Sequence, residues 1–335
     1  MTFRERYMAG KADFDEIFDL TDQWNFSDET CTLREYLGLT AQEEDIWISE
    51  SDEALEAFME HEKKRRIFFT DLDGTLLNDD HDISDGNRRA IKELLQKGHV
   101  VVICTGRAFP SAKLQAERLG LTGENCYIIC FNGGQIYDSA RRELIYRKSI
   151  PMNYVRSVFD DADKFGITAQ TYTDTHVITE HDNPNTKKYG EIQGLPMMVV
   201  ENVTKTLSHD PSKILALDFF DNQKVTDFRQ FITAHYDGIL DAYLSHPALL
   251  ELVPPGVNKG NAVRFLCNYL GIPIENSVAA GDAENDLTMI QAAHIGAVMV
   301  NGEPFMKEQA DYVTEADNNH DGVAEILHKF ILSGD

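Results

Sequence analysis

The chain has 335 residues, of which 42% are hydrophobic and 26% are charged, as in an ordinary soluble globular protein. Its formal net charge of -25 opposes binding to nucleic acid and anionic lipid, so a site for phosphate esters must supply its own positive charge. No run of 18 apolar residues and no apolar N-terminal stretch occur, so we expect a cytoplasmic protein without contact to a membrane. The five cysteines are expected to be reduced thiols, and none has the spacing of a zinc site.

Residues 1–64 are predicted to form a helical N-terminal extension. Thr40 and Glu43 have the spacing of a capping box, and Ser51 is placed to cap a further helix. The basic cluster at 63–66 is interpreted as a solvated linker, because the helices before it are strongly acidic.

From residue 67 the sequence alternates between short apolar runs and amphipathic segments. Strands are predicted at 67–70, 99–107 and 126–134, with helices at 83–98 and 111–120 between them. This βαβαβ pattern indicates an α/β fold with a doubly wound parallel sheet. The same pattern resumes late in the chain, with a helix at 259–270 and strands at 277–282 and 296–301.

The middle of the chain has a different pattern. Helices are predicted at 151–165 and 223–236, and strand-like runs occur at 175–180, 213–220, 241–246 and 248–253. We therefore expect an α+β domain over 148–252, inserted into a core domain made of 65–147 and 253–335.

The motif DLDGT follows the first predicted strand and places Asp71 and Asp73 at its carboxyl end, where open α/β sheets bind ligands. A carboxylate can attack phosphorus when a cation screens the charges, and a second carboxylate can protonate the leaving alcohol. Gly74 allows the backbone to approach a phosphate closely. A calcium-binding loop would need a glutamate at position 82, where the chain has Asp82.

Three further motifs supply groups of matching chemistry. Thr105, Gly106 and Arg107 follow the second strand, Lys259 stands at a predicted helix start, and the acidic segment 281–286 follows a late strand. Each alone is also typical of a plain turn, a surface lysine or a capping loop. Together with the first motif they predict a site for phosphate and magnesium.

DLDGT, CTGR, the lysine of GVNKG and GDAEND resemble the four ordered motifs of the haloacid dehalogenase superfamily, and most closely its Cof-type phosphatases. The resemblance covers about residues 66–333. It implies a Rossmann-like core, a large inserted α/β cap, and a reaction that passes through an aspartyl-phosphate.

The resemblance also implies roles for individual residues. The catalytic residues that it implies are Asp71 as nucleophile, Asp73 as general acid and base, and Lys259. Its magnesium ligands are the carboxylates of Asp71 and Asp282 and the main-chain carbonyl of Asp73. Its phosphate-binding residues are Thr105, Gly106, Lys259 and Asn132, and its supporting residues are Asn285 and Asp286.

The predicted function is magnesium-dependent hydrolysis of a small phosphorylated metabolite, such as a sugar phosphate, a nucleotide or a phosphorylated cofactor. Two alternatives stay open: a phosphomutase, and a sensor of phosphometabolites that acts on a protein partner through residues 1–64. Tyr172, His176 and Lys188 are candidate substrate contacts in the inserted domain.

Overall fold

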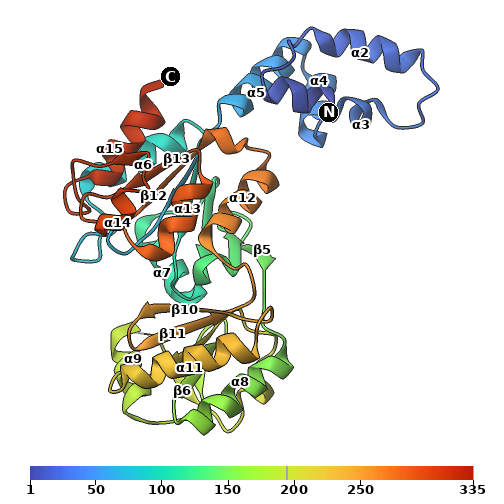
Figure 1. Cartoon of the computed structure of the whole chain (residues 1–335). Coiled ribbons are helices and arrows are strands. Elements are labelled where there is room, and N and C mark those ends of the chain that lie inside the picture. Colours follow the sequence, from blue (N-terminus) through green and yellow to red (C-terminus); the bar gives the residue numbers. More distant parts are fainter. Residues whose placement is uncertain (194, 335) are drawn as a thin grey trace.

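The structure is a computed structural model that describes residues 1–193 and 195–334. Figure 1 shows three groups of elements: N-terminal helices at the upper right, an eight-stranded sheet with flanking helices in the middle, and a six-stranded sheet below it. We propose that these groups are the predicted domains 1–64, 65–147 with 253–335, and 148–252.

The first sheet has the strand order β14-β13-β12-β1-β2-β3-β4-β5. Its strands are β1 (Ile67–Thr70), β2 (Val100–Cys104), β3 (Cys126–Cys130), β4 (Gln135–Asp138), β5 (Glu143–Arg147), β12 (Ser277–Gly281), β13 (Ile295–Val298) and β14 (Tyr312–Val313). The pairs from β14 to β3 are parallel, as predicted, whereas β4 and β5 add an antiparallel edge.

The antiparallel edge arises where the third predicted strand ends early. That strand was predicted over 126–134 but ends at Cys130, because Phe131 and Asn132 have φ values of 52° and 54°. Two consecutive left-handed residues turn the chain back on itself, so Gln135 begins β4 against β3.

Helices cover both faces of the first sheet. They are α6 (Asp85–Gln96), α7 (Phe109–Leu119), α12 (Lys259–Leu270), α13 (Leu287–Ala292), α14 (Pro304–Lys307) and α15 (Gly322–Phe330). Side chains alternate along β1, so Phe68 packs in the hydrophobic cluster of α6, α7 and α15. Ile67 and Phe69 pack in the opposite cluster with α12 and α13. The result is a three-layer α/β/α core.

The second sheet has the order β10-β11-β9-β6-β7-β8. Its elements are α8 (Met152–Phe165), β6 (Thr168–Tyr172), β7 (Val177–Thr179), α9 (Pro184–Gln193), β8 (Met197–Val199), α10 (Val203–Thr206), β9 (Ile214–Leu217), α11 (Asn222–His235), β10 (Asp241–His246) and β11 (Leu249–Val253). Helices α8 and α11 pack on the face turned away from the first sheet (Figure 1). Tyr172, Leu215 and Leu217 on the other face join a hydrophobic cluster of the first sheet. The second sheet therefore covers one end of the first.

The N-terminal extension has a hydrophobic cluster of its own. Its helices are α1 (Phe3–Met8), α2 (Glu16–Asn25), α3 (Leu33–Leu37), α4 (Ala41–Ser49) and α5 (Asp52–Lys64). The cluster is formed by Phe3, Tyr7, Phe14, Ile17, Leu37, Leu39, Leu55 and Met59. The predicted capping box is present: Thr40 Oγ1 accepts from the amide of Glu43, and the Glu43 carboxylate accepts from the amide of Thr40.

The extension adjoins the N-terminal ends of the parallel strands. A Cβ on Gly98, just before β2, would lie 2.9 Å from Cε1 of His61 in α5. Asn276 Nδ2 donates to the carbonyl of Lys63 at 2.9 Å, just before β12. The predicted site residues follow the opposite ends of these strands, so the extension lies away from them.

Candidate active site

Asp71 and Lys259 form the centre of the site. Asp71 follows β1, is buried, and accepts a hydrogen bond from Lys259 Nζ at 2.6 Å. Lys259 is fully buried although it is the first residue of α12, whose N-cap is Asn258. Burying an ammonium group requires compensating charge, and Asp71 and Asp286 both supply it.

Asp286 holds the acidic loop in place. One of its oxygens accepts from Lys259 Nζ, and the other accepts from the amides of Asp282 at 3.0 Å and Ala283 at 3.2 Å. Both carboxylate oxygens of Asp286 therefore accept hydrogen bonds from groups of the protein itself. The Asp282 side chain contacts the DLDGT loop instead, where its Oδ1 accepts from Thr75 Oγ1 at 2.8 Å.

A glycine at position 74 allows the two loops to approach. Gly74 has φ of +81°, and a Cβ on it would lie 2.5 Å from Asp282 Oδ2. Asn301 Nδ2 also donates to the carbonyl of Gly74 at 2.7 Å and fixes this turn. A side chain at position 74 would therefore push the Asp282 carboxylate away from Asp71.

The carboxylates suit a divalent cation. Asp71, Asp282 and Asp286 each offer an oxygen atom within 4.8 Å of the others, and Lys259 Nζ contacts two of them, Asp71 and Asp286. Burial raises the pKa of Asp71 to about 8 and that of Asp282 to about 6. Burial lowers the pKa of Lys259, but the charges of Asp286 and Asp71 outweigh it and raise that pKa. The raised pKa values of Asp71 and Asp282 indicate that ionising these carboxylates is costly without a further cation, and Mg²⁺, which prefers oxygen ligands, would supply that charge.

Thr105, Gly106 and Asn132 lie together beside this group of acids. The amide of Asn132 donates to the carbonyl of Thr105 at 3.1 Å, and a Cβ on Gly106 would lie 3.0 Å from Asn132 Oδ1. Asn285 Nδ2 lies 3.4 Å from the same oxygen, so Asn285 contacts Asn132. The loop after β2, the turn after β3 and the acidic loop after β12 thus meet at one end of the sheet.

Asp73 contributes no carboxylate to the acidic group. Its side chain is half exposed, and both of its oxygens accept from the guanidinium of Arg107, at 2.8 Å from Nε. The hydrogen bonds that Arg107 donates to the Asp73 carboxylate raise the pKa of Arg107. From the sequence, Arg107 was predicted only to belong to the motif of Thr105 and Gly106, and its ion pair with Asp73 was not predicted.

The three candidate contacts of the inserted region differ in position. Tyr172 is buried against Phe131, with ring centres 5.4 Å apart, and faces the first sheet. His176 Nδ1 lies 2.8 Å from its neighbour Thr175, and Lys188 lies over the ring of Phe219. Through Phe131, Tyr172 contacts the turn after β3, which carries Asn132.

Sequence reasoning missed two buried charges that reach the site. Lys213 precedes β9 and Glu251 lies in β11, and the two side chains are 3.3 Å apart. Both contact the loops that hold Gly106 and Asn132. The signal was present, because Lys213 directly precedes the apolar run ILAL and Glu251 interrupts the apolar run LLELV.

A search against protein families places most of the chain in one of them. Residues 68–327 match the model of the haloacid dehalogenase-like hydrolases, and the match begins after the extension. The chain therefore belongs to this family, in agreement with the resemblance of its four motifs and with its α/β core.

Individual relatives agree with this assignment. The Bacillus subtilis 5-amino-6-(5-phospho-D-ribitylamino)uracil phosphatase YcsE is 32% identical over 267 residues, which cover 80% of this chain and 96% of that protein. A second Bacillus subtilis protein of that activity, YwtE, is 31% identical and covers 79% of this chain and 97% of its own length. A crystal structure of a haloacid dehalogenase-like hydrolase from Bacteroides thetaiotaomicron superposes with a TM-score of 0.74 at 27% identity, over 79% of this chain and 99% of that one.

The chain is thus a phosphatase of the haloacid dehalogenase-like family. Within residues 1–193 and 195–334, no helix is both long and apolar enough to cross a membrane.

Proposed function

We propose that the protein hydrolyses a small phosphomonoester through an aspartyl-phosphate on Asp71, with Mg²⁺ as cofactor. The observation that carries the proposal is the buried contact between Lys259 Nζ and Asp71 Oδ1, beside the Asp282 carboxylate. An ammonium at this position lowers the electrostatic cost of bringing a phosphate dianion to a carboxylate.

In the first step an oxygen of Asp71 attacks phosphorus, and the bond from phosphorus to the leaving oxygen breaks. Asp73 gives its proton to the leaving alkoxide. In the second step Asp73 takes a proton from water, the water oxygen attacks phosphorus, and phosphate leaves while the Asp71 carboxylate is restored. Because Arg107 now occupies both oxygens of Asp73, Asp73 must exchange this partner before it can donate a proton.

The phosphate would be held by Lys259, Thr105, Gly106 and Asn132. The carboxylates of Asp71 and Asp282 and the main-chain carbonyl of Asp73 would hold Mg²⁺, which when bound neutralises charge on the transferring phosphoryl group. Asp286 has a separate role in the proposal: it fixes the loop of Asp282 and orients Lys259.

A panel of phosphate esters tests the activity and its metal dependence. We expect turnover of at least one sugar phosphate, nucleotide or phosphorylated cofactor with Mg²⁺, and loss of that turnover with EDTA, restored by excess Mg²⁺. The panel should include 5-amino-6-(5-phospho-D-ribitylamino)uracil, because YcsE, YwtE and a third Bacillus subtilis relative, YitU, are named for that activity. The measurement is release of inorganic phosphate. Equal turnover of the metal-free and Mg²⁺-loaded enzyme would contradict the proposed cofactor.

A chain that begins at Arg65 tests whether the extension takes part in turnover. We expect it to keep the wild-type kcat/KM, because the extension has its own hydrophobic cluster and contacts the opposite ends of the parallel strands. The measurement is steady-state turnover of p-nitrophenyl phosphate, with circular dichroism as the control for folding. A folded, truncated enzyme with altered kcat/KM would show that the extension influences the site.

A further inference from the structure

Lys213, just before β9, and Glu251, in β11, form a buried ion pair at the second sheet. Lys213 Nζ lies 3.3 Å from Glu251 Oε1, and the side chains are only 5% and 10% exposed. Removing two charges from water costs much of what their attraction returns, so a buried pair is weak evidence for a role in stability. The contacts that the pair makes beyond itself are more informative.

Each partner reaches across to a different loop of the first sheet. Lys213 Nζ donates to the carbonyl of Gly106 at 3.2 Å, and Glu251 Oε2 accepts from Asn132 Nδ2 at 3.1 Å. Lys213 Nζ also lies 5.7 Å from the centre of the Phe131 ring, a cation–π distance. One ion pair thus contacts the loop after β2 and the turn after β3 together.

The turn after β3 is a conformation that needs support. Phe131 and Asn132 both have positive φ, which is unfavourable for a side chain as large as phenylalanine. The amide of Phe131 donates to the carbonyl of Arg107 at 3.0 Å, so the strained turn and the loop of Gly106 are joined through their backbones. A contact that holds either loop therefore holds both.

The charge of Lys213 is balanced by Glu251 at close range. The pair as a whole carries no net charge, so it adds little long-range attraction for a phosphate dianion. What the pair offers the site is its two contacts, with the carbonyl of Gly106 and with the side-chain amide of Asn132.

We propose that Lys213 and Glu251 are positioning residues that set the shape of the phosphate-binding loops when residues 148–252 pack against the first sheet. The proposal rests on the phosphate-binding role proposed above for Thr105, Gly106 and Asn132. In this proposal the second sheet helps to position the loops that bind the phosphoryl group, in addition to enclosing the leaving group.

Three variants test it: Lys213→Met, Glu251→Gln, and the double variant. The probe substrate is p-nitrophenyl phosphate, whose leaving group has no hydroxyl or amine to be recognised. We expect Lys213→Met to lower kcat/KM by about 10- to 100-fold, as a supporting partner of site residues does. Glu251→Gln should lose less, because its amide oxygen can still accept from Asn132. The two effects should not add, because both residues act on the same pair of loops.

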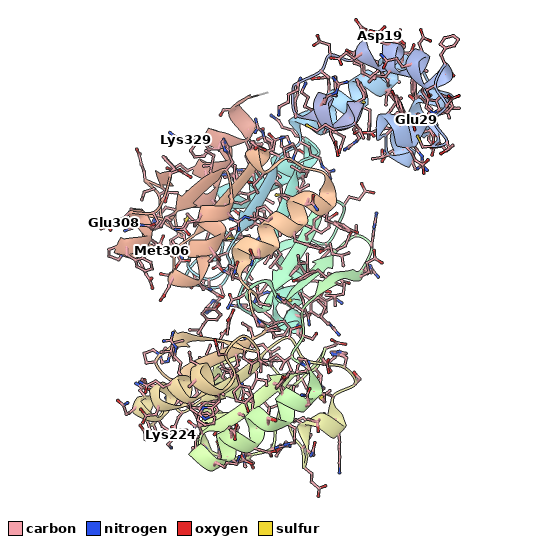
Figure 2. All side chains as sticks on the ribbon, turned by 45° about the vertical axis from the view of Figure 1, so that its right-hand side comes forward. Asp19, Glu29, Lys224, Met306, Glu308 and Lys329 are labelled. Carbon is pink, nitrogen blue, oxygen red and sulfur yellow. The ribbon has the colours of Figure 1, made fainter. Side chains whose placement is uncertain are left out.

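A structural readout separates positioning from a general loss of packing. We expect amide hydrogen exchange to speed up at 105–107 and 131–134 in the variants, while exchange in the hydrophobic cluster under α8 and α11 stays at the wild-type rate. The matched control is Lys224→Met. Lys224 pairs with Asp218 at 2.9 Å in the same sheet unit, on the side remote from the first sheet (Figure 2). Its kcat/KM should equal that of the wild type.

Lys213→Met leaves the charge of Glu251 buried without its partner, which disfavours folding. The double variant retains neither charge, so it tests the proposal if Lys213→Met does not fold. Wild-type kcat, KM and loop exchange in the folded double variant would overturn the proposal. The same result beside an inactive Asp71→Asn would leave the proposed hydrolysis intact. An active Asp71→Asn would overturn the hydrolytic mechanism, whatever the pair does.

Discussion

Asp71→Asn is expected to fold and to lose at least about 10⁴-fold in kcat, as removal of a covalent nucleophile does in other enzymes. An amide is a poor nucleophile toward phosphorus, and the remaining groups can only bind the ester. The fold should survive because burial already favours a neutral group at this position, as the raised pKa of Asp71 indicates. Lys259 keeps Asp286 as its partner.

Two measurements check this result. Turnover of the best substrate gives the loss in kcat, and acid quenching with labelled phosphoester detects the covalent intermediate, which the wild type should form and the variant should not. The matched control is Asp80→Asn, because Asp80 is an exposed aspartate in the same segment between β1 and α6. Retained turnover in Asp71→Asn, or a phosphoenzyme of wild-type yield, would remove the nucleophile assignment.

The placement of Asp71 and Thr105 of the candidate site at strand ends could be predicted because it depends on local patterns. Short apolar runs end directly before Asp71 and Thr105, and parallel strands bring such ends to one edge. The predicted helix from Lys259 to Leu270 has the bounds of α12. Figure 1 shows these elements converging on the side of the first sheet that faces the second.

Features that depend on tertiary contacts escaped prediction. Strand β4 is fully buried although it contains the polar residues Gln135 and Asp138. Their burial is possible because Gln135 Nε2 donates to Ser212 and Asp138 accepts from the amides of Ala140 and Arg141. Strand β6, with the sequence TAQTY, is also buried without an apolar run. Its burial comes from strands on both sides and from the first sheet.

The partners of charged side chains were the least predictable part. Arg107 was recognised only as a member of a motif, because its contact with Asp73 joins residues 34 positions apart. Lys213 and Glu251 contact loops more than 100 positions away. A sequence pattern locates a buried charge, but the fold decides which group compensates it.

Lys259→Met is expected to lower both stability and activity, because the Lys259 ammonium contacts the buried carboxylates of both Asp71 and Asp286. Removing one partner of a buried ion pair costs about 3–5 kcal/mol of unfolding free energy. Loss of a preorganised cation beside the transferring phosphoryl group should lower kcat/KM by about 10²- to 10³-fold or more. Denaturant unfolding and steady-state kinetics measure the two effects.

A second substitution separates charge from packing. In Lys259→Met/Asp286→Asn one of the uncompensated carboxylates is gone, so we expect part of the lost stability to return while activity stays low. Added Mg²⁺ should raise the unfolding midpoint of Lys259→Met more than that of the wild type, because the cation then meets a larger excess of negative charge. Lys329→Met is the control, since Lys329 lies on the surface of α15 (Figure 2). A Lys259→Met enzyme with wild-type stability and turnover would mean that this ammonium neither balances the buried acids nor assists the phosphoryl group.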